Sequence, residues 1–467
     1  LATGEEEREE VLYSGRTAAD SSPVSRRVDS VLFNALQRRA SDIHIETRDR
    51  EVVVKYRSDG VLYQAMKSMD KRHHSTIISR VKVMSELDIA EKRVPQDGRF
   101  KVRFSGRTID FRGSIMPTVH GEDAVIRTLD KESTNAEFHT LNLEVLGLED
   151  DTKRQLRKFI NEPYGMVLVT GPTGSGKSTT LIAALGKMAT ESVNVMTVED
   201  PVEYQLDKIN QVHVNTKVGL TFASALRTFM RQDPDIIMVG EIRDFETADL
   251  AVNAALTGHL VFSTLHTNDC AATIGRLVDI GIPSFMLASA VTMVLSQRLG
   301  RKLCQKCKKP EQRDPAELIS MGFREDEADY VVTYGPVGCP ACNGLGYKGR
   351  VGFFELMEVT DEVAKAISAE VPEDRLRKVA TNEGMVPLRN AALEKVRQGV
   401  TSVEEALKRT VAHSESLPSY LVNPDVEKYE EGDVVIREGN TDIDFFKLLR
   451  GGLSVVKGGR KIAELTE

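Results

Sequence analysis

"GPTGSGKS", from Gly171 to Ser178, decides the fold class of this chain. It fits the pattern of a phosphate-binding loop, with the apolar run "MVLVT" before it and the helix-like "STTLIAALGKMA" after it, and these two contexts argue against a chance match. The glycines let backbone N–H groups converge on phosphate oxygens, Lys177 reaches the outer phosphates, and Ser178 offers a hydroxyl to Mg2+. The residues expected to contact phosphates here are Gly171, Pro172, Thr173, Gly174, Ser175, Gly176, Lys177, Ser178 and Thr179.

Four short apolar runs, "GMVLVTG", "VNVMTVED", "PDIIMVGE" and "HLVFSTLH", are separated by helical patterns. This is typical of a buried parallel sheet covered on both faces, in which residues at the carboxyl ends of strands reach the ligand crevice. Glu199 and Glu241 end two of the runs, so one could hold metal-bound water while the other polarises the attacking water. His266 ends a third run and His259 begins it; the alternative for His259 is a hydrogen bond to the backbone of its own loop.

The chain has five cysteines, and four of them form two Cys-x-x-Cys pairs, in "LCQKCKK" and "GCPACNG". With 31 residues between the pairs, Cys304, Cys307, Cys339 and Cys342 can supply the four thiolates of a tetrahedral Zn2+ site. A redox pair and free thiols are the alternatives. Four thiolates would leave no open position on the metal, so we expect a structural role.

Composition limits the class of protein. The chain has 467 residues with 62 basic and 70 acidic side chains, a net charge of -8, which argues against nucleic acid as the main partner. The apolar stretch Ile280–Gln297 contains Pro283 and several polar residues, so we expect a buried helix rather than a membrane span. The chain begins at Leu1, and we treat it as part of something longer.

The sequence divides into six segments. We expect a linker or disordered segment over 1–22, a mixed α+β domain over 23–130, a linker over 131–145, the parallel-sheet domain over 146–301, a zinc-binding helical subdomain over 302–413, and a β-rich segment over 414–467.

These ordered motifs, together with "TVEDPVEYQLDKINQVHVN", "LRTFMRQDPDIIMVGEIRD" and "AEKRVPQDGRF", resemble the secretion ATPase superfamily, and within it a type II secretion or type IV pilus assembly ATPase. The resemblance implies a RecA-like α/β ATPase domain behind a PAS-like domain. It makes Lys177 and Ser178 the Walker A site, Glu199 the general base, Glu241 the Walker B acid, and His259 with His266 a His box. The arginines that it implies for phosphate contact are Arg112, Arg127, Arg227, Arg231 and Arg243.

The same resemblance implies a homohexamer that uses ATP, Mg2+ and structural Zn2+ and acts on an inner-membrane platform protein, with the chain cytoplasmic and peripheral at the inner face of the membrane. By the same resemblance we expect this sequence to lack the family's N-terminal docking domain, and the segment 414–467 looks like the first strands of a cyclic-nucleotide-binding β-roll. A nucleic-acid translocase and a regulatory ATP-binding scaffold with little turnover are the rival interpretations.

Overall fold

The computed structural model describes residues 9–11, 23–104, 106–129, 143, 146–410, 452–457 and 460–466. The chain divides into two compact units, Leu1–Glu415 and Ser416–Glu467. The described part of the first unit contains two large sheets, each with its own hydrophobic core, and a smaller body beyond the second sheet.

The first sheet belongs to the segment expected to be mixed α+β. Its strands are β1 (Glu9–Val11), β2 (Asp42–Thr47), β3 (Glu51–Ser58), β4 (Val61–Gln64), β5 (Met69–Asp70), β6 (Gln96–Phe104), β7 (Arg107–Thr118) and β8 (Gly121–Leu129). Their order is β1-β6-β7-β8-β2-β3-β4, with β5 on β3, and every pairing except β1 with β6 is antiparallel. Helices α1 (Pro23–Gln37) and α2 (His74–Met84) pack on one face, where Leu32 and Val81 share a core with Phe111. Strand residues alternate between faces, so the exposed cross-strand neighbours Arg112 and Arg127 lie on the other face.

The second sheet has the order β11-β10-β12-β13-β9-β14-β17. Its strands are β9 (Gly165–Thr170), β10 (Val195–Glu199), β11 (Ile209–His213), β12 (Ile236–Val239), β13 (Leu260–Leu265), β14 (Val291–Leu303) and β17 (Tyr347–Glu358). The pairings from β11 to β14 are parallel, and β17 runs antiparallel to β14. The four apolar runs of the sequence are therefore parallel neighbours, as expected.

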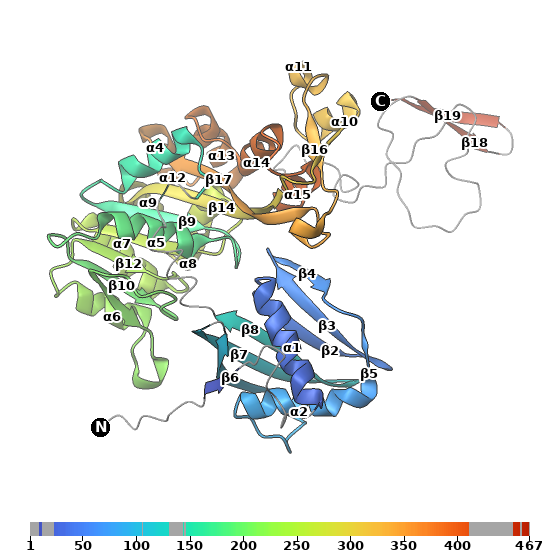
Figure 1. Ribbon diagram of the computed structural model, residues 1–467. Coiled ribbons are helices and arrows are strands. Elements are labelled where there is room, and N and C mark those ends of the chain that lie inside the picture. Colours follow the sequence, from blue (N-terminus) through green and yellow to red (C-terminus); the bar gives the residue numbers. More distant parts are fainter. Residues whose placement is uncertain are drawn as a thin grey trace. The chain divides into compact units, whose positions relative to one another are not determined.

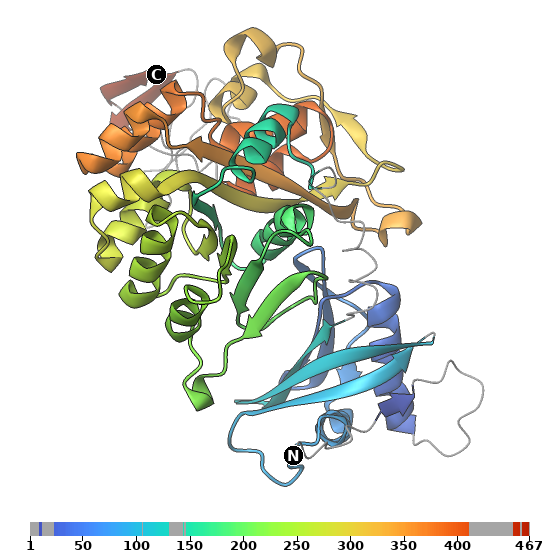
Figure 2. The same ribbon diagram turned by 90° about the vertical axis from the view of Figure 1, so that its left-hand side faces the viewer.

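Helices cover both faces of this sheet (Figures 1 and 2). Met166 and Leu168 of β9 join the core under α6 (Phe222–Phe229), α7 (Phe245–Leu256), α8 (Cys270–Ile280), α9 (Ser284–Ala290), α12 (Asp361–Ser368) and α13 (Glu373–Asn382). Val167 and Val169 point the other way, into the core under α4 (Asp150–Phe159) and α5 (Lys177–Met188). Both sets of side chains are apolar because both faces are buried, and the strands therefore show continuous apolar runs.

The stretch Ile280–Gln297 is not the single buried helix expected from its composition. Helix α8 ends at Ile280, α9 covers Ser284–Ala290, and strand β14 begins at Val291 without an intervening loop. The apolar residues after Ala290 can be buried in a sheet as well as in a helix, so their composition does not decide between the two. Among the described residues, no helix is long and apolar enough to cross a membrane.

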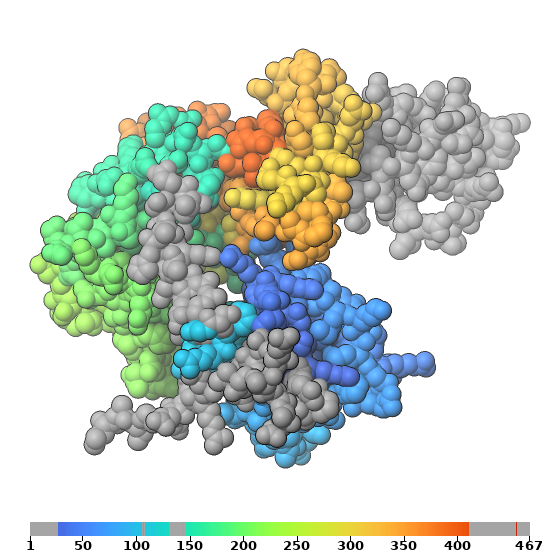
Figure 3. Space-filling view, viewed as in Figure 1, coloured from blue at the N-terminus to red at the C-terminus, as the bar shows by residue number. Residues whose placement is uncertain are grey.

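Strands β14 and β17 carry a smaller body beyond the sheet. It contains β15 (Lys309–Glu311), β16 (Thr333–Gly335), α10 (Pro315–Ser320), α11 (Glu325–Ala328), α14 (Leu388–Arg397) and α15 (Val403–Arg409). Phe353 of β17 packs with Phe323, Leu393 and Val403 in its core. Figure 3 shows these yellow to orange residues as one contiguous body.

The described residues of the first unit also contain the 3-10 turns η1 (Lys71–His73), η2 (Thr216–Val218) and η3 (Pro340–Cys342). In the second unit, β18 (Gly452–Lys457) pairs antiparallel with β19 (Arg460–Thr466). The rest of the expected β-roll, and most of the expected linkers 1–22 and 131–145, lie outside the described residues.

Candidate functional site

The phosphate loop joins β9 to α5 at the carboxyl edge of the second sheet. Gly171 (φ 145°) and Gly176 (φ 89°) have positive φ angles that residues with a Cβ rarely adopt. Lys177 Nζ donates to Gly171 O at 2.8 Å and to Pro172 O at 3.2 Å, so it lies across the mouth of the loop. The exposed members of the expected loop are Pro172, Thr173, Gly174 and Ser178. A concave row of backbone N–H groups at the start of a helix is suited to phosphate.

Two charged side chains, Glu241 and Arg298, lie near Lys177. Burial lowers the pKa of Lys177; Glu241 opposes this shift and Arg298 adds to it. Glu241 accepts a hydrogen bond from Arg243, and its Oε2 lies 3.5 Å from His266 Nε2. Glu241 follows β12 and His266 follows β13, so adjacent parallel strands bring both to the same edge. The structure thus brings together four of the residues selected from the sequence.

Glu199 ends β10, the strand next to β12. Its side chain is 8% exposed, and Oε1 accepts hydrogen bonds from Thr197 Oγ1 at 2.7 Å and from Gln211 Nε2 at 3.0 Å. These two donors fix the orientation of the carboxylate, and the strand order places it one strand beyond Glu241 on the same edge.

His259 does not accompany His266. It precedes β13 at the opposite edge of the sheet, where its Nδ1 lies 3.0 Å from Ala254 O and its backbone N–H donates to the same oxygen. His259 therefore contacts a backbone carbonyl, as the alternative for it proposed, but that carbonyl belongs to the last turn of α7 and not to its own loop. The two histidines stand at the two ends of one strand, because a parallel strand delivers its first and last residues to opposite edges.

The arginines fall into three groups. Only Arg243 contacts the loop-side carboxylate, Glu241. Arg227 on α6 pairs with Glu246, and Arg231, in the turn after α6, donates from NH1 to Arg227 O at 3.1 Å; both arginines are exposed.

Arg112 and Arg127 are cross-strand neighbours on β7 and β8 of the first sheet. Arg127 Nε donates to Asp42 Oδ1 at 2.9 Å, and both arginines are exposed on the face opposite α1 and α2. Like charges directly opposite one another in a sheet destabilise it unless an anion offsets them.

Two residues next to the loop were missed by the sequence reasoning. Gln297 and Arg298 lie on β14, beside the strand that enters the loop. A Cβ on Gly171 would come within 2.5 Å of Gln297 O and 3.2 Å of Arg298 NH1. The signal that points to them is "SQRLG", a polar pair that interrupts an apolar run at the end of the helix expected over Ile280–Gln297.

The four cysteines of the two pairs converge. Their sulfurs all lie within 4.8 Å of one another, with 3.9 Å between Cys304 and Cys339, 3.8 Å between Cys307 and Cys342, and 3.7 Å between Cys339 and Cys342. Four thiolates 2.3 Å from a tetrahedral zinc ion would be separated by about 3.8 Å, so the donor set fits.

One thiol of this cluster is prepared as a thiolate. Burial acts to raise the pKa of Cys342, but hydrogen bonds from the backbone N–H groups of Cys339 and Gly346 outweigh it and lower that pKa to about 6. Backbone N–H groups aimed at a sulfur favour its charged form, which is the metal-binding form.

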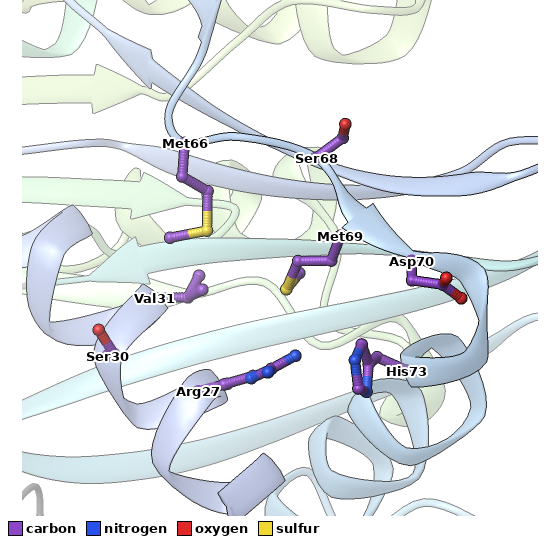
Figure 4. Close-up of a pocket in the computed structure, with 8 residues that line it drawn as sticks. All are labelled: Arg27, Ser30, Val31, Met66, Ser68, Met69, Asp70 and His73. Carbon is purple, nitrogen blue, oxygen red and sulfur yellow. The ribbon is translucent and has the colours of Figure 1, made fainter.

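A separate hollow of about 430 Å³ lies between α1 and the segment that follows β4 (Figure 4). Met66 and Met69 project into it, and Arg27 and His73 stand at its edge. Its one acidic residue, Asp70, already binds the Arg72 guanidinium and caps the following turn. None of the site residues expected from the sequence lines this hollow.

Comparison with known proteins agrees with this geometry. The family model described as type II/IV secretion system protein matches residues 17–408. The chain belongs to this family. A type II secretion system protein E from Pectobacterium carotovorum is 46% identical over 393 residues, which are 84% of this chain and 77% of that protein. The type IV pilus assembly ATPase PilB of Myxococcus xanthus is 45% identical over 395 residues, 84% of this chain and 69% of its own length.

Solved structures of secretion-family proteins share the fold. The pilus retraction motor PilT, solved with bound ADP, is similar at a TM-score of 0.52 and 27% identity, over 81% of this chain and 95% of PilT. The Legionella pneumophila ATPase DotB has a TM-score of 0.57 at 21% identity, over 85% of this chain and 97% of DotB, which supports the fold alone.

Proposed function

We propose that this secretion-family chain is an ATPase motor that hydrolyses ATP with Mg2+ to drive type IV pilus assembly or type II secretion. The observation that carries the proposal is the convergence of Lys177, Glu241 and His266 at the carboxyl edge of one sheet, beside the phosphate loop. The names of the relatives support both loads, because one is a secretion protein and another a pilus assembly ATPase.

Each side chain has a defined part in this function. The loop N–H groups and Lys177 bind the phosphates and offset their charge, and the Ser178 hydroxyl with Glu241 would hold Mg2+, which supplies charge neutralisation at the phosphates. Glu199, oriented by Thr197, takes the proton of the attacking water. His266, 3.5 Å from Glu241, would respond when the terminal phosphate leaves.

The finer parts of the proposal concern assembly. A homohexamer would let exposed arginines of one subunit, among them Arg112, Arg127, Arg227 and Arg231, contact nucleotide held by another. A structural zinc ion on the four cysteines would stabilise the body that β14 and β17 carry. We place the motor at the cytoplasmic face of the membrane, acting on a platform protein.

The test is phosphate release by the purified chain. Lys177→Ala and Glu199→Gln should each lower the rate at least ~100-fold, because they remove phosphate charge compensation and the general base. Lys187→Ala is the matched control, since Lys187 is an exposed lysine in the last turn of the same helix. Wild-type rates in the first two variants would refute the proposal, and stimulation by DNA but not by platform protein would replace it with a translocase.

A further inference from the structure

Gln297 is a buried side chain that joins the phosphate loop to its helix. It is 2% exposed, and its amide Nε2 donates to Ser175 O in the loop at 2.7 Å. At the other end of the amide, Oε1 accepts from Thr180 Oγ1 on α5 at 2.9 Å. Both partners are themselves buried, so one carboxamide satisfies two polar groups that water does not reach.

The Ser175 carbonyl matters because of the peptide that it belongs to. In a trans peptide the C=O and the following N–H point in opposite directions. Drawing Ser175 O toward Gln297 therefore turns the Gly176 N–H away from Gln297, toward the open side of the loop. Gly176 is also the residue that precedes α5, so this N–H lies at the positive end of the helix.

Gln297 is itself held in place. It lies on β14 directly after Ser296, which pairs with Thr170 at the end of β9. Arg298 NH1 donates to Gln297 O at 3.1 Å, and Arg298 NH2 donates to Asn268 O at 2.8 Å. The backbone of Gln297 thus cannot shift without disturbing the loop that follows β13.

From these contacts we infer that Gln297 is a positioning residue for nucleotide binding: by holding the Ser175 carbonyl it aims the Gly176 N–H at the phosphates. The inference rests on the proposed function and deepens it, because it assigns to β14 a part in phosphate recognition. Gln297 touches the loop only, and its effect on nucleotide passes through Ser175 and Gly176.

The experiment measures binding of a fluorescent ADP analogue with Mg2+ to the full chain, and KM and kcat for ATP. Gln297→Met keeps the length and volume of the side chain but removes both ends of the hydrogen-bonded bridge. The loss of one correctly aimed N–H to a charged phosphate should raise the Kd of the analogue about tenfold or more. The rise in KM should exceed the fall in kcat, because the contact exists before the reaction as well as during it.

Thr401→Val is the matched control. Thr401 is fully buried, and its Oγ1 donates to Arg301 O at 2.8 Å. Arg301 lies on β14 like Gln297, but four residues further along and away from the loop. It should lower the melting temperature as Gln297→Met does while leaving affinity for the analogue unchanged. If Gln297→Met fails to fold, Thr180→Val takes its place: it removes the hydrogen bond at the other end of the Gln297 amide and should raise the Kd of the analogue severalfold.

Two results separate this inference from the proposed function. The inference is wrong, and Gln297 is structural only, if the wild-type chain binds the analogue and the Kd of Gln297→Met lies within about twofold of the wild-type Kd. It is also wrong if Thr401→Val raises the Kd as much as Gln297→Met does. If the wild-type chain binds no ADP analogue or ATP, the proposed function fails and the inference with it.

Discussion

Glu355→Leu should loosen the starts of two helices at once. Glu355 lies on β17 and is 1% exposed; Oε1 accepts from Cys270 N at 2.8 Å and Oε2 from Leu388 N at 2.9 Å. Cys270 begins α8 and Leu388 begins α14, so one carboxylate serves two helix N-termini. Each buried N–H left without an acceptor costs about 1–3 kcal/mol, which gives a local loss of about 2–6 kcal/mol.

Amide hydrogen exchange is the suitable assay, because it reports local opening in a chain with several cores. Exchange in the first turns of α8 and α14 should accelerate together in Glu355→Leu. Glu358→Leu, on the same strand, is the matched control: Glu358 is 30% exposed and pairs with Lys158 at the surface, a contact worth less than ~1 kcal/mol. Unchanged exchange at both helix starts, or an equal effect in the control, would refute this reasoning.

The same variant makes a prediction about pH. Burial raises the pKa of Glu355, the N–H donor of Cys270 opposes this, and the charge of Asp269 adds to it. A carboxyl whose pKa is higher in the folded than in the unfolded state contributes stability below the ordinary value of about 4.3, and that contribution falls as pH rises through the folded pKa. The stability difference between wild type and Glu355→Leu should therefore be larger at pH 4 than at pH 7, as urea unfolding would measure.

Two other predictions concern the body carried by β14. Glu405 is 1% exposed, and its Oε2 lies 2.8 Å from Arg301 NH2. Burial acts to raise the pKa of Glu405, but hydrogen bonds from Arg301 and Arg409 outweigh burial and lower that pKa. Glu405→Leu should thus cost about 3–5 kcal/mol at pH 7, and the cost should shrink as pH falls below about 4.3; equal urea midpoints at pH 7 would contradict this. The purified chain should carry one zinc per polypeptide by elemental analysis and Cys342→Ser should lose it on dialysis, whereas full retention by the variant would show that the cysteines are not the ligands.

The sequence predicts which of the candidate residues share a sheet edge, because each lies at or just after the end of a short buried strand. Glu199, Glu241 and Lys177 could be placed at one edge from strand direction alone, since parallel strands end together. The same rule puts His266, which ends its run, at that edge and His259, which begins the run, at the opposite edge; only the family resemblance grouped the two histidines.

Other parts depend on contacts that no local pattern encodes. The boundary between α9 and β14 has no glycine, proline or turn to mark it, so an apolar run was assigned to one helix and Gln297 was placed at a helix end. Glu355 gave no signal either, because its two partners lie 85 and 33 residues away along the chain. Such long-range hydrogen bonds are set by the packing of whole elements.

The pairing of β14 with β17 has a consequence for how the chain folds. The ladder runs from Met293 opposite Glu358 to Leu303 opposite Tyr347, and its two strands are joined by a long excursion that contains all four cysteines. Bringing together the ends of so long a loop costs several kcal/mol of chain entropy, so this hairpin is slow to nucleate unaided. A zinc ion that binds Cys304 and Cys342 first would close this long connection as a tight turn would. The pairing of β14 with β17 could then form from that end toward the phosphate loop. Metal supply during synthesis would in that way set how quickly the nucleotide site is completed.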